Sequence, residues 1–240
     1  MNFITGDTHG EVMNLIQRIK LCSIKGGNRL FIAGDFGFIR ETNKREIYKE
    51  DRRLEHINDY AESKGIEILF IDGNHENFNR LLKFPEIDLY GGKMGEIKHN
   101  ILHLKRGYVY TIEGKKIFTM GGGISVDKSS RVENVSWWKE ELHSLEEQNR
   151  AIDNLEAHQW KVDYVVTHSA PSQAKEMIKR AMKKAGIDNS RKFDVFNAES
   201  KFHSYIYNNL KFKEWHFGHY HQDHSEGNLN LHYIVTRKFY

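Results

Sequence analysis

The sequence predicts an α/β fold, in which β-strands alternate along the chain with helices. Short apolar runs recur, and most of them stop at a polar turn that contains glycine. Longer stretches with charged residues and helical spacing of apolar residues separate these runs. Apolar runs bounded by turns are typical of buried strands, and apolar residues at helical spacing are typical of helices with one buried face.

Six apolar runs are predicted to be strands. They cover residues 2–5, 30–33, 66–71, 116–120, 164–167 and 215–217. Five stretches are predicted to be helices, at residues 11–21, 44–64, 136–158, 172–185 and 199–210. In the second helix, Ile47, Leu54 and Ile57 lie close to helical spacing, so one face can be buried. Residues 86–107 are expected to be less regular and to form part of the rim above a site.

Composition predicts one folded domain over residues 1–240. The chain is 39% hydrophobic and 29% charged, which suits an ordered core and a charged surface. It contains no whole-unit repeat and no proline-rich linker, since its two prolines are Pro85 and Pro171. The net charge of +3 permits a nucleotide or nucleic-acid partner without requiring one.

The single cysteine, Cys22, restricts both redox chemistry and metal binding. One cysteine forms no intramolecular disulfide and excludes a cysteine-rich zinc site, so His, Asp, Glu or Asn must hold any metal. The sequence has neither a signal-peptide pattern at its start nor an apolar run that approaches the length of a membrane span. We therefore expect a cytoplasmic protein without a membrane partner.

Potential metal-binding side chains follow five of the predicted strands. They lie in the segments Gly6-Asp7-Thr8-His9-Gly10, Gly34-Asp35-Phe36-Gly37, Gly73-Asn74-His75-Glu76, Thr167-His168 and Gly218-His219-Tyr220-His221. The carboxyl ends of strands in α/β sheets gather at one edge, so these segments can converge. Each segment alone could be an ordinary turn. Together they predict a cation site, because unpaired Asp and His side chains in one crevice would cost several kcal/mol.

These segments resemble the signature of the calcineurin-like metallophosphoesterase superfamily, which reads D-x-H, G-D, G-N-H-[D/E], H and G-H-x-H. The match extends from Asp7 to His221. The resemblance implies a sandwich of two mixed β-sheets flanked by helices, with a metal centre on the loops at one edge. It also implies that Asp7, His9 and His221 hold one metal and that Asn74, His168 and His219 hold the other. Asp35 would bridge the two metals.

The implied reaction is phosphoester hydrolysis. Two divalent cations about 3.5 to 4 Å apart can share one hydroxide and position it for attack on phosphorus. His75 is the expected catalytic residue, as a proton donor or phosphate contact; the alternative is that it only orients a ligand. The mixed His, Asp and Asn ligands favour manganese, with iron or zinc as alternatives.

The substrate is not predicted uniquely. Protein Ser/Thr phosphatases of this superfamily carry Asp and Arg where this chain has Phe38 and Ile39, which argues against that activity. Arg40 and Arg131 are candidate phosphate contacts, although surface positions would explain both. We expect a nucleotide or RNA phosphodiester, or a small phosphomonoester. The alternatives are a Ser/Thr protein phosphatase and a non-catalytic metal-binding scaffold.

Aromatic residues are interleaved with the ligand segments and allow two interpretations. These residues are Phe36, Phe38, Phe78 and Tyr220. Their rings could stack on a nucleobase, or they could pack in the core beneath the loops. Core packing is the plainer expectation.

Overall fold

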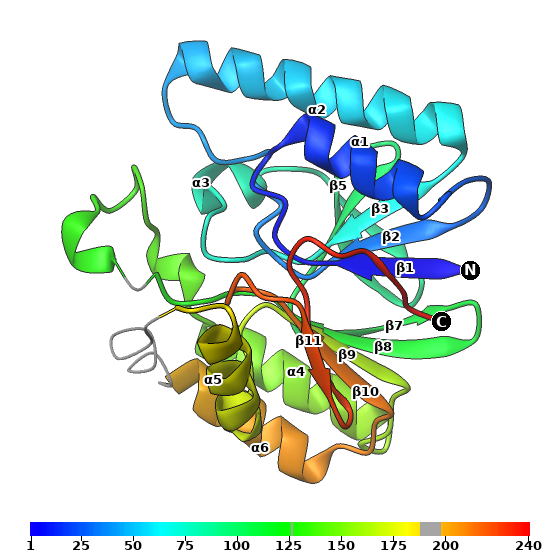
Figure 1. The fold of residues 1–240 in the computed structure, drawn as a ribbon, viewed down its shortest axis with the longest axis vertical. Coiled ribbons are helices and arrows are strands. Elements are labelled where there is room, and N and C mark those ends of the chain that lie inside the picture. Colours follow the sequence, from blue (N-terminus) through cyan, green and yellow to red (C-terminus); the bar gives the residue numbers. More distant parts are fainter. Residues whose placement is uncertain (126, 188–197) are drawn as a thin grey trace.

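Two β-sheets pack face to face between layers of helices. A computed structural model of the chain describes residues 1–125, 127–187 and 198–240. One sheet has seven strands in the order β13-β1-β2-β3-β6-β5-β4, and the other has six in the order β11-β12-β10-β9-β8-β7. Helices α1 and α2 cover the first sheet, while α4, α5 and α6 cover the second (Figure 1). The predicted sandwich of two mixed sheets is therefore confirmed.

The seven-stranded sheet has a parallel centre and antiparallel edges. Its parallel strands are β1 (Asn2–Thr5), β2 (Arg29–Ile32), β3 (Glu67–Phe70) and β6 (Ile101–Leu104). Its antiparallel strands are β4 (Glu86–Leu89), β5 (Gly92–Lys98) and β13 (Arg237–Lys238). Thr5 aligns with Ile32, and Ile32 aligns with Phe70. The loops that follow β1, β2 and β3 therefore leave the sheet side by side.

The six-stranded sheet repeats this arrangement. Its parallel strands are β8 (Lys115–Met120), β9 (Tyr164–Thr167), β10 (Glu214–Phe217) and β12 (Leu229–Leu231). Antiparallel strands β7 (Tyr108–Ile112) and β11 (His224–Glu226) complete it. Thr167 aligns with Phe217, so the loops after β9 and β10 also begin at one level.

The helices bury one face each against the sheets. Their bounds are α1 (Val12–Leu21), α2 (Lys44–Lys64), α3 (Phe78–Leu81), α4 (Leu145–Ala157), α5 (Lys175–Lys184) and α6 (Ala198–Asn209). Short 3₁₀ turns cover Lys128–Ser130, Lys139–Glu141 and Ser172–Ala174. None of the helices in the described ranges is long and apolar enough to cross a membrane.

Three apolar layers hold the elements together. Leu15 of α1 and Ile57 of α2 pack on the outer face of the first sheet. Ile4 and Val166 belong to the layer between the two sheets. A third layer lies between the second sheet and its helices and includes Trp215. Each sheet thus buries both faces, which accounts for the nearly continuous apolar character of the central strands.

Two predictions about secondary structure are wrong. The helix expected at 136–158 begins only at Leu145, because Ser144 and Glu147 form a reciprocal capping box there. Residues 86–107 form β4, β5 and β6 instead of an irregular rim. Gly92 belongs to the β4–β5 hairpin, where Leu89 pairs with it.

Candidate metal centre

The predicted ligands converge on one edge of the sandwich. The first sheet supplies Asp7 and His9 after β1, Asp35 after β2, and Asn74 with His75 after β3. The second sheet supplies His168 after β9, and His219 with His221 after β10. The side chains of the two sheets contact one another at this edge. A centre at this edge therefore depends on the packing of the two sheets against each other.

Asn74, His168 and His219 form the inner group of the centre. The Asn74 Oδ1 atom lies 3.1 Å from His168 Nε2 and 3.0 Å from His219 Nδ1. His168 has no exposed surface, and its Nδ1 lies 2.9 Å from the Ala33 carbonyl oxygen. Since that carbonyl accepts a hydrogen bond from Nδ1, the Nε2 atom of His168 is oriented toward the centre.

Asp7, His9 and His221 form the outer group. The Nε2 atoms of His9 and His221 are 3.1 Å apart, and His221 Nε2 is 3.1 Å from Asp7 Oδ2. The Asp7 Oδ2 atom is buried, and the contact with His221 lacks the angle of a hydrogen bond, so this oxygen has no hydrogen-bond partner within the described parts of the chain. With Asp35 included, the donor atoms of this group lie within 4.8 Å of one another. A buried carboxylate oxygen facing two imidazole nitrogens fits a cation.

Asp35 lies between the two groups. Its Oδ1 accepts a hydrogen bond from the His75 backbone N–H at 3.0 Å and lies 3.5 Å from His168 Nε2. Its side chain also belongs to the outer donor cluster. One carboxylate therefore reaches both groups, which is the arrangement needed to share it between two cations.

The chain approaches itself closely around these ligands. A side chain at Gly34 would meet His168 Nδ1 at 2.0 Å, and one at Gly73 would meet Asp35 Oδ1 at 2.0 Å. These glycines are required because the ligands occupy the space of a Cβ atom. Several ligands also adopt left-handed backbone conformations. Their φ angles are +49° at His9, +47° at Asp35, +72° at His219 and +51° at His221.

The carboxylates and imidazoles perturb one another strongly. Burial acts to raise the pKa of Asp35, but contact with His168 holds this pKa well below its usual range. Burial acts to lower the pKa of His168, yet Asp35 and Asp7 raise it to about 10. Burial, reinforced by His168, lowers the pKa of His219 to about 3. Without cations, a proton on His168 balances the carboxylates, and divalent metals would take over this role.

His75 contacts Arg131 rather than a carboxylate at its Nδ1 atom. Arg131 Nη1 lies 3.4 Å from His75 Nδ1, and a guanidinium only donates hydrogen bonds. The contact therefore assigns the ring proton to Nε2, which is 4.0 Å from Asp35 Oδ2. Burial lowers the pKa of His75; Asp35 opposes this shift and Arg131 adds to it.

A cavity of about 230 Å³ opens over the centre, and we call it the metal-site cavity. Its lining includes Asp35, Asn74, His75, Arg131, His219 and His221. Arg131 is held by Asp127, whose Oδ1 lies 2.8 Å from Arg131 Nε, and by the Ser136 carbonyl. Arg40 is exposed and is not among the residues that line this cavity. The structure thus brings one of the two candidate arginines to the site.

Several residues that shape the centre were not predicted from the sequence. Glu76 is buried and accepts hydrogen bonds from the backbone N–H groups of Gly37 and Gly73, joining two ligand loops. Burial and the nearby Asp35 raise the pKa of Glu76 to about 8. Glu76 could have been identified from the sequence, because it lies in the ligand segment Gly73-Asn74-His75-Glu76. Asp127 could have been noticed from its four-residue spacing to Arg131.

Most of the interleaved aromatic residues pack in the core. Phe36, Phe38 and Phe78 are buried in the layer beneath α1 and α2. Tyr220 is also largely buried, but it lines the metal-site cavity. Core packing, the plainer of the two interpretations, is therefore confirmed for the three phenylalanines.

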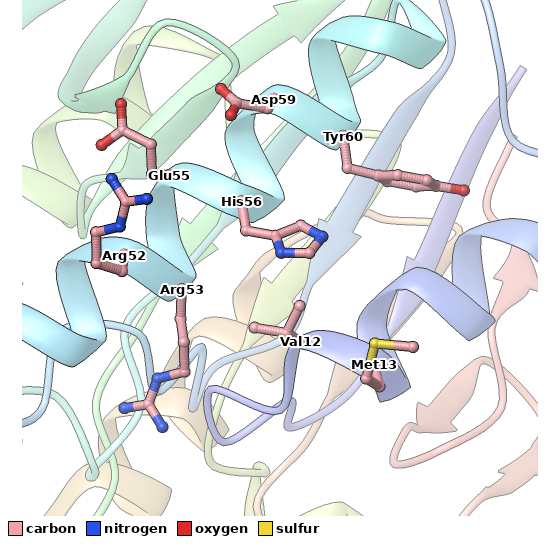
Figure 2. A pocket seen from close by; sticks show the side chains of 8 residues that line it. All are labelled: Val12, Met13, Arg52, Arg53, Glu55, His56, Asp59 and Tyr60. Atoms are coloured by element: carbon pink, nitrogen blue, oxygen red, sulfur yellow. The ribbon is translucent and has the colours of Figure 1, made fainter.

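A larger hollow of about 1060 Å³ lies elsewhere, between α1 and α2. Figure 2 shows Val12 and Met13 on α1 facing Arg53 and His56 on α2. Its lining contains none of the predicted ligands. Its size therefore does not indicate chemistry, and the converging ligands identify the smaller metal-site cavity as the candidate site.

The fold and the converging ligands define a protein of the α/β sandwich class with a candidate metal site at one sheet edge. A sequence model of the calcineurin-like phosphoesterase family matches residues 3–223, and the chain belongs to this family. The matched range includes all the predicted ligands. Membership supports metal-dependent phosphoester hydrolysis, and proteins of this family generally bind two divalent metals. No curated protein matches the chain.

Proposed function

We propose that this chain hydrolyses phosphoesters with two divalent cations, one held by the inner group and one by the outer group. The position of Asp35 carries the proposal, because its carboxylate reaches donor atoms of both groups. The bound cations would supply Lewis acidity, polarising the phosphoryl group and lowering the pKa of the attacking water. Manganese is the proposed metal, with iron or zinc as alternatives, since the ligands are oxygen and imidazole nitrogen.

His75 and Arg131 provide the groups that act on the substrate. With its proton at Nε2, His75 can donate a hydrogen bond to the phosphoryl or leaving oxygen as negative charge grows there. Arg131 keeps His75 in this orientation and adds positive charge to the cavity that an anionic phosphate would enter. His75 therefore acts as a hydrogen-bond donor, and a step in which it gives up its proton is not required.

The proposed substrate is a nucleotide or RNA phosphodiester, or a small phosphomonoester. A Ser/Thr protein phosphatase is less well supported, because Phe38 and Ile39 are completely buried and offer no group to a phosphate. A non-catalytic metal-binding scaffold remains the alternative of another class. It differs from the enzyme in one measurable property, which is turnover by the metal-loaded protein.

The decisive experiment compares metal-stripped and manganese-loaded protein on 4-nitrophenyl phosphate and bis(4-nitrophenyl) phosphate. We expect manganese to restore hydrolysis of at least one substrate. His75→Ala should retain its metals and lower kcat by about 10²-fold, because it removes a hydrogen-bond donor from the reacting group. His56→Ala on the surface of α2 serves as the control and should behave as wild type.

Two outcomes would contradict the proposal. Metal-loaded protein that hydrolyses neither ester would favour the scaffold. A metal content below about one ion per chain under saturating manganese would rule out two cations. An unchanged rate in His75→Ala would remove only the catalytic assignment of that residue.

A further inference from the structure

A second cavity lies on the α1 side of the metal centre, and we call it the α1 cavity. Its volume is about 320 Å³, within the range of about 300 to 1,000 Å³ that is usual for small-molecule sites. Asp7 and His9 of the outer group line it, whereas His221 lines the metal-site cavity. Since His9 Nε2 and His221 Nε2 are 3.1 Å apart, a residue that lines one cavity contacts a residue that lines the other.

The α1 cavity presents amide groups on one wall. Asn14 and Gln17 are three residues apart on α1, so they share a face, and both side chains are exposed. Within the described part of the chain, neither amide makes a hydrogen bond. Each amide offers a donor and an acceptor, the pair of functions with which Asn and Gln bind the edges of nucleobases.

An aromatic ring forms another wall of the α1 cavity. Tyr233 stacks on His221, with ring centroids 4.8 Å apart and an interplanar angle of 17°. The Tyr233 backbone is fixed, because its N–H donates to Asp223 and its carbonyl accepts from the Gly6 N–H. A tyrosine held in this way next to a metal ligand can pack against a planar base or a sugar.

The floor of the α1 cavity is rigid. Arg18 is 7% exposed and donates hydrogen bonds to Thr5 Oγ1 and to the carbonyls of Gly6 and Asp7. No carboxylate of the described residues forms an ion pair with it. Asp7 and Asp223 act on the Arg18 charge, and Glu11 also lines the cavity, so the floor contributes a fixed shape rather than a net positive charge.

We propose that the α1 cavity binds the nucleoside that stays attached to phosphorus when a phosphodiester is hydrolysed. The inference rests on the proposed function and names its substrate class. His75 lies in the metal-site cavity, so the leaving alcohol belongs there. The retained ester arm then extends past the His9 and His221 pair into the α1 cavity. A phosphomonoester has no second arm and leaves this cavity empty.

Three esters with the same leaving group test this assignment. They are 4-nitrophenyl phosphate, methyl 4-nitrophenyl phosphate and thymidine 5′-(4-nitrophenyl phosphate), which differ only in the retained arm. We expect KM for the thymidine ester to be about tenfold below KM for the methyl ester, because two amide hydrogen bonds supply such a factor. The double variant Asn14→Ala, Gln17→Ala should lose this preference, and Lys20→Ala on exposed α1 surface should keep it.

Binding without turnover gives an independent measurement. In chelator-treated protein, thymidine should shift the side-chain amide NMR signals of Asn14 and Gln17. Equal KM values for the methyl and thymidine esters in wild type, or a preference that survives in the double variant, would overturn the inference. Failure to hydrolyse any of the three esters would contradict the proposed function. The NMR measurement alone would then show whether the α1 cavity binds a nucleoside, and the absence of a shift would overturn the inference.

Discussion

The inner and outer groups use similar side chains but are held in different ways. His168 of the inner group has no exposed surface and is fixed by the Ala33 carbonyl and by Asn74. The side chain of His221 in the outer group is 41% exposed and rests on Tyr233 and His9 through ring contacts. His168 is thus fixed by a backbone carbonyl and a buried side chain, while His221 is held by ring contacts near the surface.

This difference indicates that the two groups contribute differently to the stability of the fold and to the rate at which a bound cation exchanges. A ligand fixed by backbone hydrogen bonds is already oriented before a cation arrives, so little order has to be created on binding. An exposed ligand has more rotamers to lose and more water to displace. We expect the outer cation to exchange faster and the inner ligands to contribute more to the folded state.

Asp35→Asn should weaken metal binding at the inner and outer groups alike, because both groups use this carboxylate, and so remove the difference between them. We expect metal content to fall and kcat/KM to drop by about 10³-fold, which corresponds to about 4 kcal/mol of lost transition-state stabilisation. Metal analysis and hydrolysis assays measure both effects. Asp59→Asn on the exposed face of α2 is the matched control. Full metal occupancy in Asp35→Asn would show that this residue is not shared.

His168→Ala and His221→Ala should differ in their effect on the free energy of unfolding. In metal-stripped protein, His168→Ala should lower the free energy of unfolding by about 3 kcal/mol, because it leaves Asp35 and Asp7 as buried, unbalanced charges. His221→Ala should change it by less than about 1 kcal/mol, since the side chain is exposed. Chemical unfolding with urea measures both values. Equal losses in the two variants would contradict the distinction between the groups.

The inner group should also make the free energy of unfolding of metal-stripped protein depend on pH. Burial acts to lower the pKa of His168 in the folded protein, but the larger combined effect of Asp35 and Asp7 raises this pKa from 6.5 to about 10. Its contribution to stability is complete below pH 6.5 and is lost as the pH rises toward 10. Unfolding should therefore become easier over this range in wild type. His168→Ala should show a flatter profile, and identical profiles would refute the prediction.

The smallest expected effect concerns Asp127, outside both groups. Its side chain is 50% exposed and pairs with Arg131, and exposed ion pairs contribute at most about 1 kcal/mol. Asp127→Asn should raise KM by about two- to fivefold through looser positioning of Arg131, with metal content unchanged. Glu46→Gln removes another exposed ion pair, to Lys49, and is the control. A loss of metal in Asp127→Asn would contradict the prediction, because it would show that Asp127 supports metal binding as well as the position of Arg131.

The sequence predicted the elements whose signals are local. The apolar runs at β1, β9 and β10 stand out in any short window, and the polar turns after them follow directly. The order of the ligand segments carried the family resemblance. The position of each ligand after a strand therefore followed from periodicity and motif together.

What the sequence did not predict depends on contacts between distant segments. Strand β6 forms because Ile101 and Leu102 align with Ile68 and Leu69 of β3, and no local pattern encodes that pairing. The role of Glu76 likewise depends on the N–H group of Gly37, which lies in another loop. The contact between Arg131 and His75 joins residues 56 positions apart, so spacing alone could not distinguish Arg131 from Arg40.

The left-handed backbone at the ligands sets stability and function against each other. A non-glycine residue in this conformation costs about 1 to 2 kcal/mol, and His9, Asp35, His219 and His221 all adopt it. Replacing one of them by glycine would relieve that cost while removing a ligand. Mutants selected only for thermal resistance would therefore tend to lose the centre, and selection for the proposed activity would be needed to keep it.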